Sequence, residues 1–411
     1  MNEPEVKNEM ERSYSFTAHG LNRMLNTVDD LEFQEKDATK IIETLRDQMR
    51  VVHFSEYLKR YIYLRSGMVG SYRKIPLEEY RDTICDSFQT TGTPVSLKHL
   101  TTRVSSRVGS WLQQTEVRRD VVLLLGFGLN MNREDVNDFL TKAIHEHVLD
   151  EQEPMEAVCG YCYDHHYGFL KMQQLMQILK EAEQGNDPGE LIARNLPAGR
   201  EDLREAAGAD EGLIRRILSQ LENRDETGQK ARTRKVFQDF YGQTENLIHQ
   251  DPELREAEQE SGRKEKKGSD FSRKYSDIEK VLYASVPKER NGNLIAEINS
   301  SLMAVLTGKR LSRQRISRLM GGTEEPTKYD LETLEFLICA KTKQSLDARE
   351  RGYQFVEDMN RILAECGFGG IYPADPYDCF LVMCMLSVDP LGTFSDVMEM
   401  SYESRGTEES E

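Results

Sequence analysis

The strongest constraint on the fold is an internal repeat. Four features recur in the same order between 208 and 223 residues further along the chain. They are the apolar triplet Val108, Trp111 and Leu112 (returning as Ile316, Leu319 and Met320), Leu123 (Leu331), EDVNDFL at 134–140 (EDMNRIL at 357–363), and Pro154-Met155-Glu156 (Pro376-Tyr377-Asp378, one residue out of register). The repeat predicts two copies of one helical module, since 411 residues suffice for two or three domains.

The periodicity of the apolar residues predicts an all-α protein. No segment shows sustained alternation with a period of two, whereas Phe54, Tyr57, Leu58, Tyr61 and Ile62 follow the spacing of one helix face. A helix is expected from Asp37 to about Arg65, ended by Gly67.

Composition divides the chain into six segments. The modules are joined by a charged, partly helical region and a stretch without a core-forming pattern. The expected segments are an acidic mobile arm (1–36), helical module one (37–180), a charged helical connector (181–250), a flexible linker (251–272), helical module two (273–402) and an acidic tail (403–411).

Residues 311–326, LSRQRISRLMGGTEEP, predict a short helix with defined ends. Ser312 is a good N-cap, and Ile316 and Leu319 fall on one face with Met320. Gly321-Gly322 stops the helix before Pro326. The remaining face is basic and polar, as contacts to phosphates and base edges require. The candidate DNA-binding residues are Lys309, Arg310, Ser312, Arg313, Gln314, Arg315 and Arg318.

This stretch resembles the phage-repressor-like (Xre/Cro type) helix-turn-helix family. The resemblance spans about residues 290–345 and rests on matches to a family pattern of small, apolar and turn residues. The matching residues are Ala304, Gly308, Ser312, Ile316, Ser317, Leu319, Gly322, Pro326, Leu331 and Leu334. The resemblance implies a recognition helix at 312–320 and makes module one a diverged helix-turn-helix copy.

Each copy continues in a way that is similar to the helical extension of some bacterial, largely Firmicutes, helix-turn-helix proteins. In the second copy the extension reads VEDMNRILAECGFGGIYPADPYDCFLVMCML. Asn137 and Asn360 are expected at helix starts within it, and its role is expected to be scaffolding.

Two functions follow from these patterns. The first is a DNA-binding regulator of the helix-turn-helix transcriptional type, which contacts duplex DNA through module two. Two modules, or a homodimer, could then span two half-sites. The alternative is a non-enzymatic protein-interaction adaptor on the same fold, for instance in a phage-defence or mobile-element system. A continuous positive face would favour DNA, and acidic neighbours covering the arginines would favour the adaptor.

Charge and composition exclude several other classes. The formal net charge of -17 repels nucleic acid and anionic membrane, so any DNA contact must be local. A polar, acidic start predicts no signal peptide, and the longest apolar run, 121–129, predicts no membrane span. Seven irregularly spaced cysteines suit a reducing cytoplasm. Phosphate-loop and nucleophile-elbow motifs do not occur, so neither an enzyme nor a cofactor is expected.

One group of residues has the composition of a zinc site. Cys159, Cys162, His165 and His166 offer thiolate and imidazole ligands. Both cysteines, however, follow the apolar spacing of a helix, where cysteine acts as a small apolar residue. The matching helix of the second copy has no histidine, so the expectation is no metal.

Overall fold

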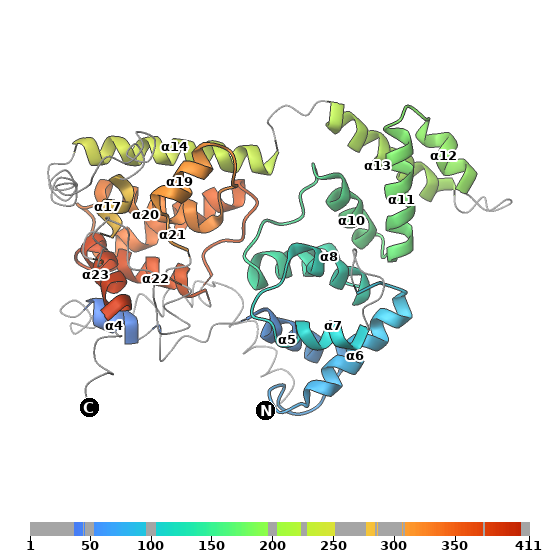
Figure 1. Cartoon of the computed structure of the whole chain (residues 1–411), viewed down its shortest axis with the longest axis horizontal. Coiled ribbons are helices and arrows are strands. Elements are labelled where there is room, and N and C mark those ends of the chain that lie inside the picture. The colour runs from blue at the N-terminus through green and yellow to red at the C-terminus, as the bar shows by residue number, and fades with distance from the viewer. Residues whose placement is uncertain are drawn as a thin grey trace. The chain divides into compact units, whose positions relative to one another are not determined.

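The computed structural model describes residues 37–43, 45, 53–95, 104–195, 204–222, 228–250, 277–283, 286, 306, 309–372 and 375–403. Within these ranges the regular secondary structure is helical, with no strand longer than a single-residue bridge (Figure 1). The all-α prediction is therefore confirmed. None of the described helices is both long and apolar enough to cross a lipid bilayer.

The chain divides into two compact units. The N-terminal unit comprises Val52–Gln229, and the C-terminal unit comprises Met1–Val51 together with Lys230–Glu411. The predicted arm at 1–36, linker at 251–272 and nearly all of the tail at 403–411 lie outside the described residues, as do Ala304 and Gly308.

In the N-terminal unit the apolar helix α8 lies at the centre and packs against α6, α9 and α10. The helices are α5 (Phe54–Ser66), α6 (Leu77–Thr91), α7 (Val104–Trp111), α8 (Arg119–Gly128), α9 (Arg133–Asp138), the π-helix η2 (Phe139–Ala143), α10 (Pro154–Asp164), α11 (Phe169–Ala182), α12 (Pro188–Asn195) and α13 (Arg204–Glu222). A side chain at Gly128 would collide with the ring of Phe88, so this glycine serves close helix packing.

In the C-terminal unit α20 is the central helix, because every residue from Lys328 to Ala340 is buried. It packs against α21, α22 and α23. The helices are α4 (Asp37–Glu43), α14 (Gln229–Gln250), α17 (Asp277–Leu282), α19 (Arg313–Met320), α20 (Lys328–Thr342), α21 (Ala348–Glu365), α22 (Pro376–Met385) and α23 (Pro390–Glu403).

The units divide the chain differently from the predicted segments. Helix α4, expected to open module one, packs on α22 and α23 of the C-terminal unit. The region 181–250, expected to be a connector, is split: α12 and α13 pack on α11, whereas α14 contributes Phe237 and Tyr241 to the core of the C-terminal unit. The helix expected from Asp37 to Arg65 is therefore two helices, α4 and α5, in different units; the second ends before Gly67, as predicted.

Candidate functional site

Helix α19 forms as its sequence predicts. The Ser312 Oγ accepts the backbone N–H of Arg315 at 3.2 Å, which satisfies one of the free donors of the first turn. Ile316 and Leu319 are buried in the core of the unit. The chain leaves the helix through Gly322, whose φ of 69° lies in the left-handed region.

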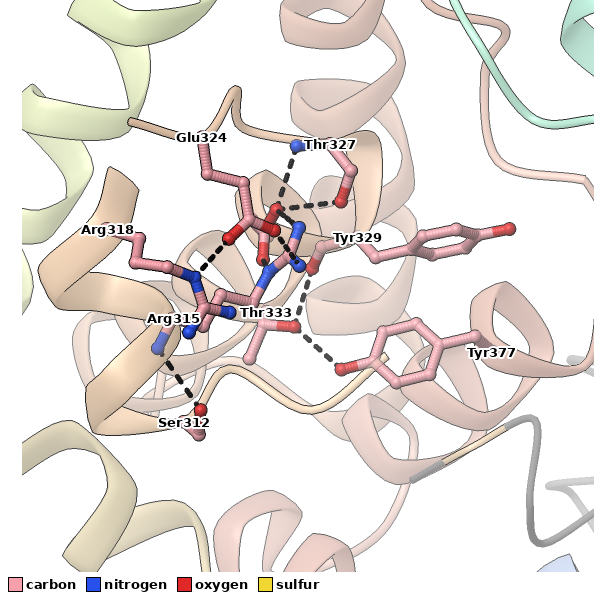
Figure 2. Close-up of polar contacts among 9 residues, drawn as sticks. Ser312, Arg315, Arg318, Glu324, Thr327, Tyr329, Thr333 and Tyr377 are labelled. Carbon is pink, nitrogen blue, oxygen red and sulfur yellow. Dashed lines mark hydrogen bonds and ion pairs between the residues drawn. The ribbon is translucent and has the colours of Figure 1, made fainter. Parts of the chain in front are cut away.

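Arg315 is bound to two acidic side chains of its own unit (Figure 2). Its Nε and Nη2 donate to the two carboxylate oxygens of Asp330, each at 2.7 Å, and its Nη1 donates to Glu324 Oε1 at 2.6 Å. Asp330 is fully buried and also accepts the N–H and O–H of Thr327 at the start of α20. Paired bonds of this geometry are strong, so Arg315 joins α19 to α20.

Arg318 extends this arrangement at the surface. Its Nε donates to Glu324 Oε2 at 2.6 Å, while 52% of its side chain remains exposed. We call Arg315, Arg318, Glu324 and Asp330 the α19 ion-pair cluster; two positive and two negative charges make it neutral.

The other predicted DNA-binding residues are dispersed around this cluster. Gln314 is exposed, and Arg310 is half-buried. The Lys309 Nζ lies 4.2 Å from the centre of the Tyr329 ring. Arg313 is half-buried, and its backbone N–H donates to the carboxylate of Glu279 at 3.3 Å. Among the described residues, acidic side chains therefore lie beside the basic face of α19 at Arg313, Arg315 and Arg318.

A second polar arrangement, which occurs once in each unit, was missed from the sequence. Lys328 is the first residue of α20, and its Nζ donates to Asp378 Oδ2 at 2.7 Å. Arg119 is the first residue of α8, and its Nε donates to Glu156 Oε1 at 2.6 Å. Both carboxylates occupy the third position of a helix that begins with proline. A basic residue at the start of an apolar helix in both units was the available signal.

The same carboxylates hold the loops that precede their helices. Glu156 Oε2 accepts the backbone N–H of Asp150 at 2.8 Å, and Asp378 Oδ2 accepts that of Tyr372 at 2.6 Å. Each acceptor lies six residues after its donor. The ion pair and the loop contact therefore occur together in both units.

Asn137 and Asn360 also have equivalent roles, although both lie within helices and not at helix starts as expected. Asn137 Oδ1 accepts the N–H of Leu149 at 2.9 Å, twelve residues on. Asn360 Oδ1 accepts the N–H of Ile371 at 2.7 Å, eleven residues on. The π-helix η2 lies within the longer interval, and a π-turn accommodates one additional residue. The extra residue of the longer interval therefore coincides with this π-helix.

The cysteine and histidine residues considered for zinc are not arranged around a common point. Cys159 and Cys162 are buried in α10, and burial raises the pKa of the Cys162 thiol to about 12. His165 and His166 are exposed after the end of the helix. Within the described parts of the chain, no three His, Cys, Asp or Glu side chains are placed to hold a metal ion.

Comparison with family models, with curated proteins and with solved structures finds no match for this chain.

Proposed function

We propose that this chain is a non-enzymatic protein-interaction adaptor, in which the element resembling a helix-turn-helix serves as a scaffold. The observation that carries the proposal is the α19 ion-pair cluster. Arg315 and Arg318, two of the arginines expected to reach DNA, bind Glu324 and Asp330 of the same unit. The formal net charge of the whole chain, -17, also supports an adaptor, because a negatively charged protein is repelled by a polyanion such as DNA.

We further propose that the two units contain diverged copies of one helical module. The support is a pair of matching contacts in each unit. Arg119 pairs with Glu156, and Lys328 pairs with Asp378. In addition, Asn137 and Asn360 each accept a hydrogen bond from the backbone of the loop that follows. Two types of contact, each present in both units in the same chain order, favour duplication over coincidence. Such an adaptor presents two related surfaces on one chain.

DNA binding is the second candidate, and the exposure of Gln314 and Arg318 favours it. Neither side chain belongs to the buried Ile316 and Leu319 face. A surface ion pair such as Arg318–Glu324 contributes at most about 1 kcal/mol, so a phosphate could replace Glu324 as the partner of Arg318. In this case Ser312 and Arg315 hold the helix, and Lys309, Arg310, Arg313, Gln314 and Arg318 contact DNA.

A salt titration with random duplex DNA separates the two candidates. We expect no measurable binding of the wild-type chain even at low salt. A DNA-binding protein using four of these basic residues would instead bind with a log–log salt slope of about -3 to -4. Binding of that kind, abolished by the double variant Arg313→Glu/Arg318→Glu, would contradict the adaptor proposal. Glu324→Gln should strengthen such binding by releasing Arg318.

The matched control is Arg349→Glu/Arg361→Glu, which changes the net charge equally at two exposed positions of α21. Loss of binding in both double variants would indicate a general charge effect. Thermal melting of each variant establishes that the fold is retained.

A cross-linking experiment provides the positive test of the adaptor. A photo-reactive amino acid at the exposed position Gln314 should yield a discrete protein adduct in the native host, which Arg318→Glu weakens. The same probe at Glu357, exposed on α21, is the control. Equal adducts from both positions would remove the α19 surface as the docking face.

A further inference from the structure

Three buried carboxyl groups lie near the ammonium group of Lys328, the first residue of α20. The Lys328 Nζ lies 2.7 Å from Asp378 Oδ2 and 3.5 Å from Glu332 Oε1. Asp375 accepts the O–H of Tyr329 at 2.7 Å. We call Lys328, Glu332, Asp375 and Asp378 the Lys328 cluster; each is at most 2% exposed.

The hydrogen bonds within this cluster are unequally distributed. Asp378 Oδ2 accepts Lys328 and the N–H of Tyr372, and Asp375 accepts Tyr329 and the N–H of Tyr377 at 2.8 Å. Among the described atoms, by contrast, both oxygens of Glu332 and the Oδ1 of Asp378 have no hydrogen-bond partner. Buried acceptors without donors are costly, and a buried charge without compensation costs more.

A single proton resolves this imbalance. A protonated Glu332 is neutral and has an O–H to donate to the neighbouring Asp378 carboxylate. Asp375 and Asp378 are the better carboxylates of the three, because they lie at the start of α22, where the helix dipole favours negative charge. Glu332 lies within α20 and has no such support.

The N-terminal unit provides a natural comparison without the additional acid. Arg119 pairs with Glu156 there, and the residue four positions after Arg119 is the buried Leu123. Four positions after Lys328 stands Glu332. The pair between the helices is thus retained in both units, and the additional carboxyl group belongs to the C-terminal unit alone among the residues compared.

We propose that Glu332 is a buried proton-binding site, which holds a proton while α20 and α22 are packed together and releases it when they separate. The cluster then couples the closure of the C-terminal unit to pH. Because Asp330, two residues after Lys328, anchors Arg315, the same helix that binds the proton also positions α19.

The direction of the pH dependence follows from the surroundings of Glu332. The titratable groups that face it are Lys328 and Tyr329 of α20, Tyr377 and Asp378 of α22, and Asp375, the N-cap of α22. Burial and the Asp375 carboxylate also raise the pKa of Asp378, to about 7. Burial and the Asp378 carboxylate raise the pKa of Glu332 well above its usual range. The folded state therefore binds the proton more tightly than the unfolded state. The stability that this bound proton contributes is fully present below the unfolded-state pKa of a glutamate, about 4.3. It declines as the pH rises toward the pKa of Glu332 in the folded state.

Thiol labelling of the full chain, read out by peptide mass spectrometry, tests this inference. Cys379 and Cys384 are buried in α22 and become reactive only when the helix opens. The variant Glu332→Gln retains a donor for Asp378 but does not titrate. We expect the wild-type labelling rate, divided by that of Glu332→Gln, to rise about tenfold per pH unit up to the folded pKa of Glu332.

Two controls separate an effect of Glu332 from a general effect of pH. The labelling rate of Cys159 and Cys162 in the N-terminal unit, wild type divided by Glu332→Gln, should stay constant across pH. Glu357→Gln, at an exposed position of α21, should give a constant ratio at every cysteine. If Glu332→Gln folds poorly, Glu332→Leu, which places an apolar side chain in the apolar surroundings of α20, is the second non-titrating variant. A ratio that stays flat for Cys379 and Cys384 between about pH 5 and pH 8 overturns the proposal, since one proton would change it over that range.

Discussion

Replacing Trp111 with alanine should lower the free energy of unfolding of the N-terminal unit by about 3 to 5 kcal/mol. The side chain is 2% exposed, and its ring lies 5.7 Å from that of the buried Phe88. Truncation therefore removes a large apolar surface and leaves a cavity between α6 and α7. Chemical denaturation followed by circular dichroism measures the loss, because Trp111 is the only tryptophan available for fluorescence.

Two further variants complete this experiment. Val69→Ala, at a side chain that is 93% exposed, should change stability by no more than about 0.5 kcal/mol. Leu319→Ala, at the position that the proposed repeat matches to Trp111, should destabilise the C-terminal unit by about 2 to 5 kcal/mol, because this side chain is also buried. An unchanged melting temperature for Trp111→Ala would contradict the assignment of Trp111 as an anchor of the repeated module.

Replacing Lys328 with methionine should destabilise the C-terminal unit by about 3 to 5 kcal/mol at neutral pH. Methionine fills a similar volume, so the loss comes mainly from leaving Asp378 and its neighbours buried without a counter-charge. Protonation of these carboxyl groups removes the penalty. The difference between wild type and variant should therefore shrink as the pH is lowered, which denaturation at several pH values will measure.

Arg119→Met is the matched variant in the N-terminal unit. The side chains of Arg119 and Glu156 are 21% and 11% exposed, so water can reach the carboxylate that the variant leaves behind. We expect a smaller loss than for Lys328→Met and a weaker dependence on pH. Equal losses in the two units would show that burial of the additional carboxyl groups does not determine the cost.

The sequence alone predicted the features that depend on neighbouring residues. The N-cap at Ser312, the buried face with Ile316 and Leu319, and the end of the helix at Gly322 are all present. The helical fold class follows from the same local rules. Capping and amphipathic spacing act within a few residues, so the chain order contains the information needed to locate them.

The structure was required for contacts between distant residues. Arg315 meets Asp330, fifteen residues away, and Lys328 meets Asp378, fifty residues away. The sequence shows only that these residues are charged. Whether an arginine faces solvent or a buried carboxylate depends on how the helices pack, which also decides that α4 joins the C-terminal unit. The charge available to a partner on α19 was therefore set by tertiary structure, because the packing that buries Asp330 also pairs it with Arg315, whose side chain is left only 22% exposed.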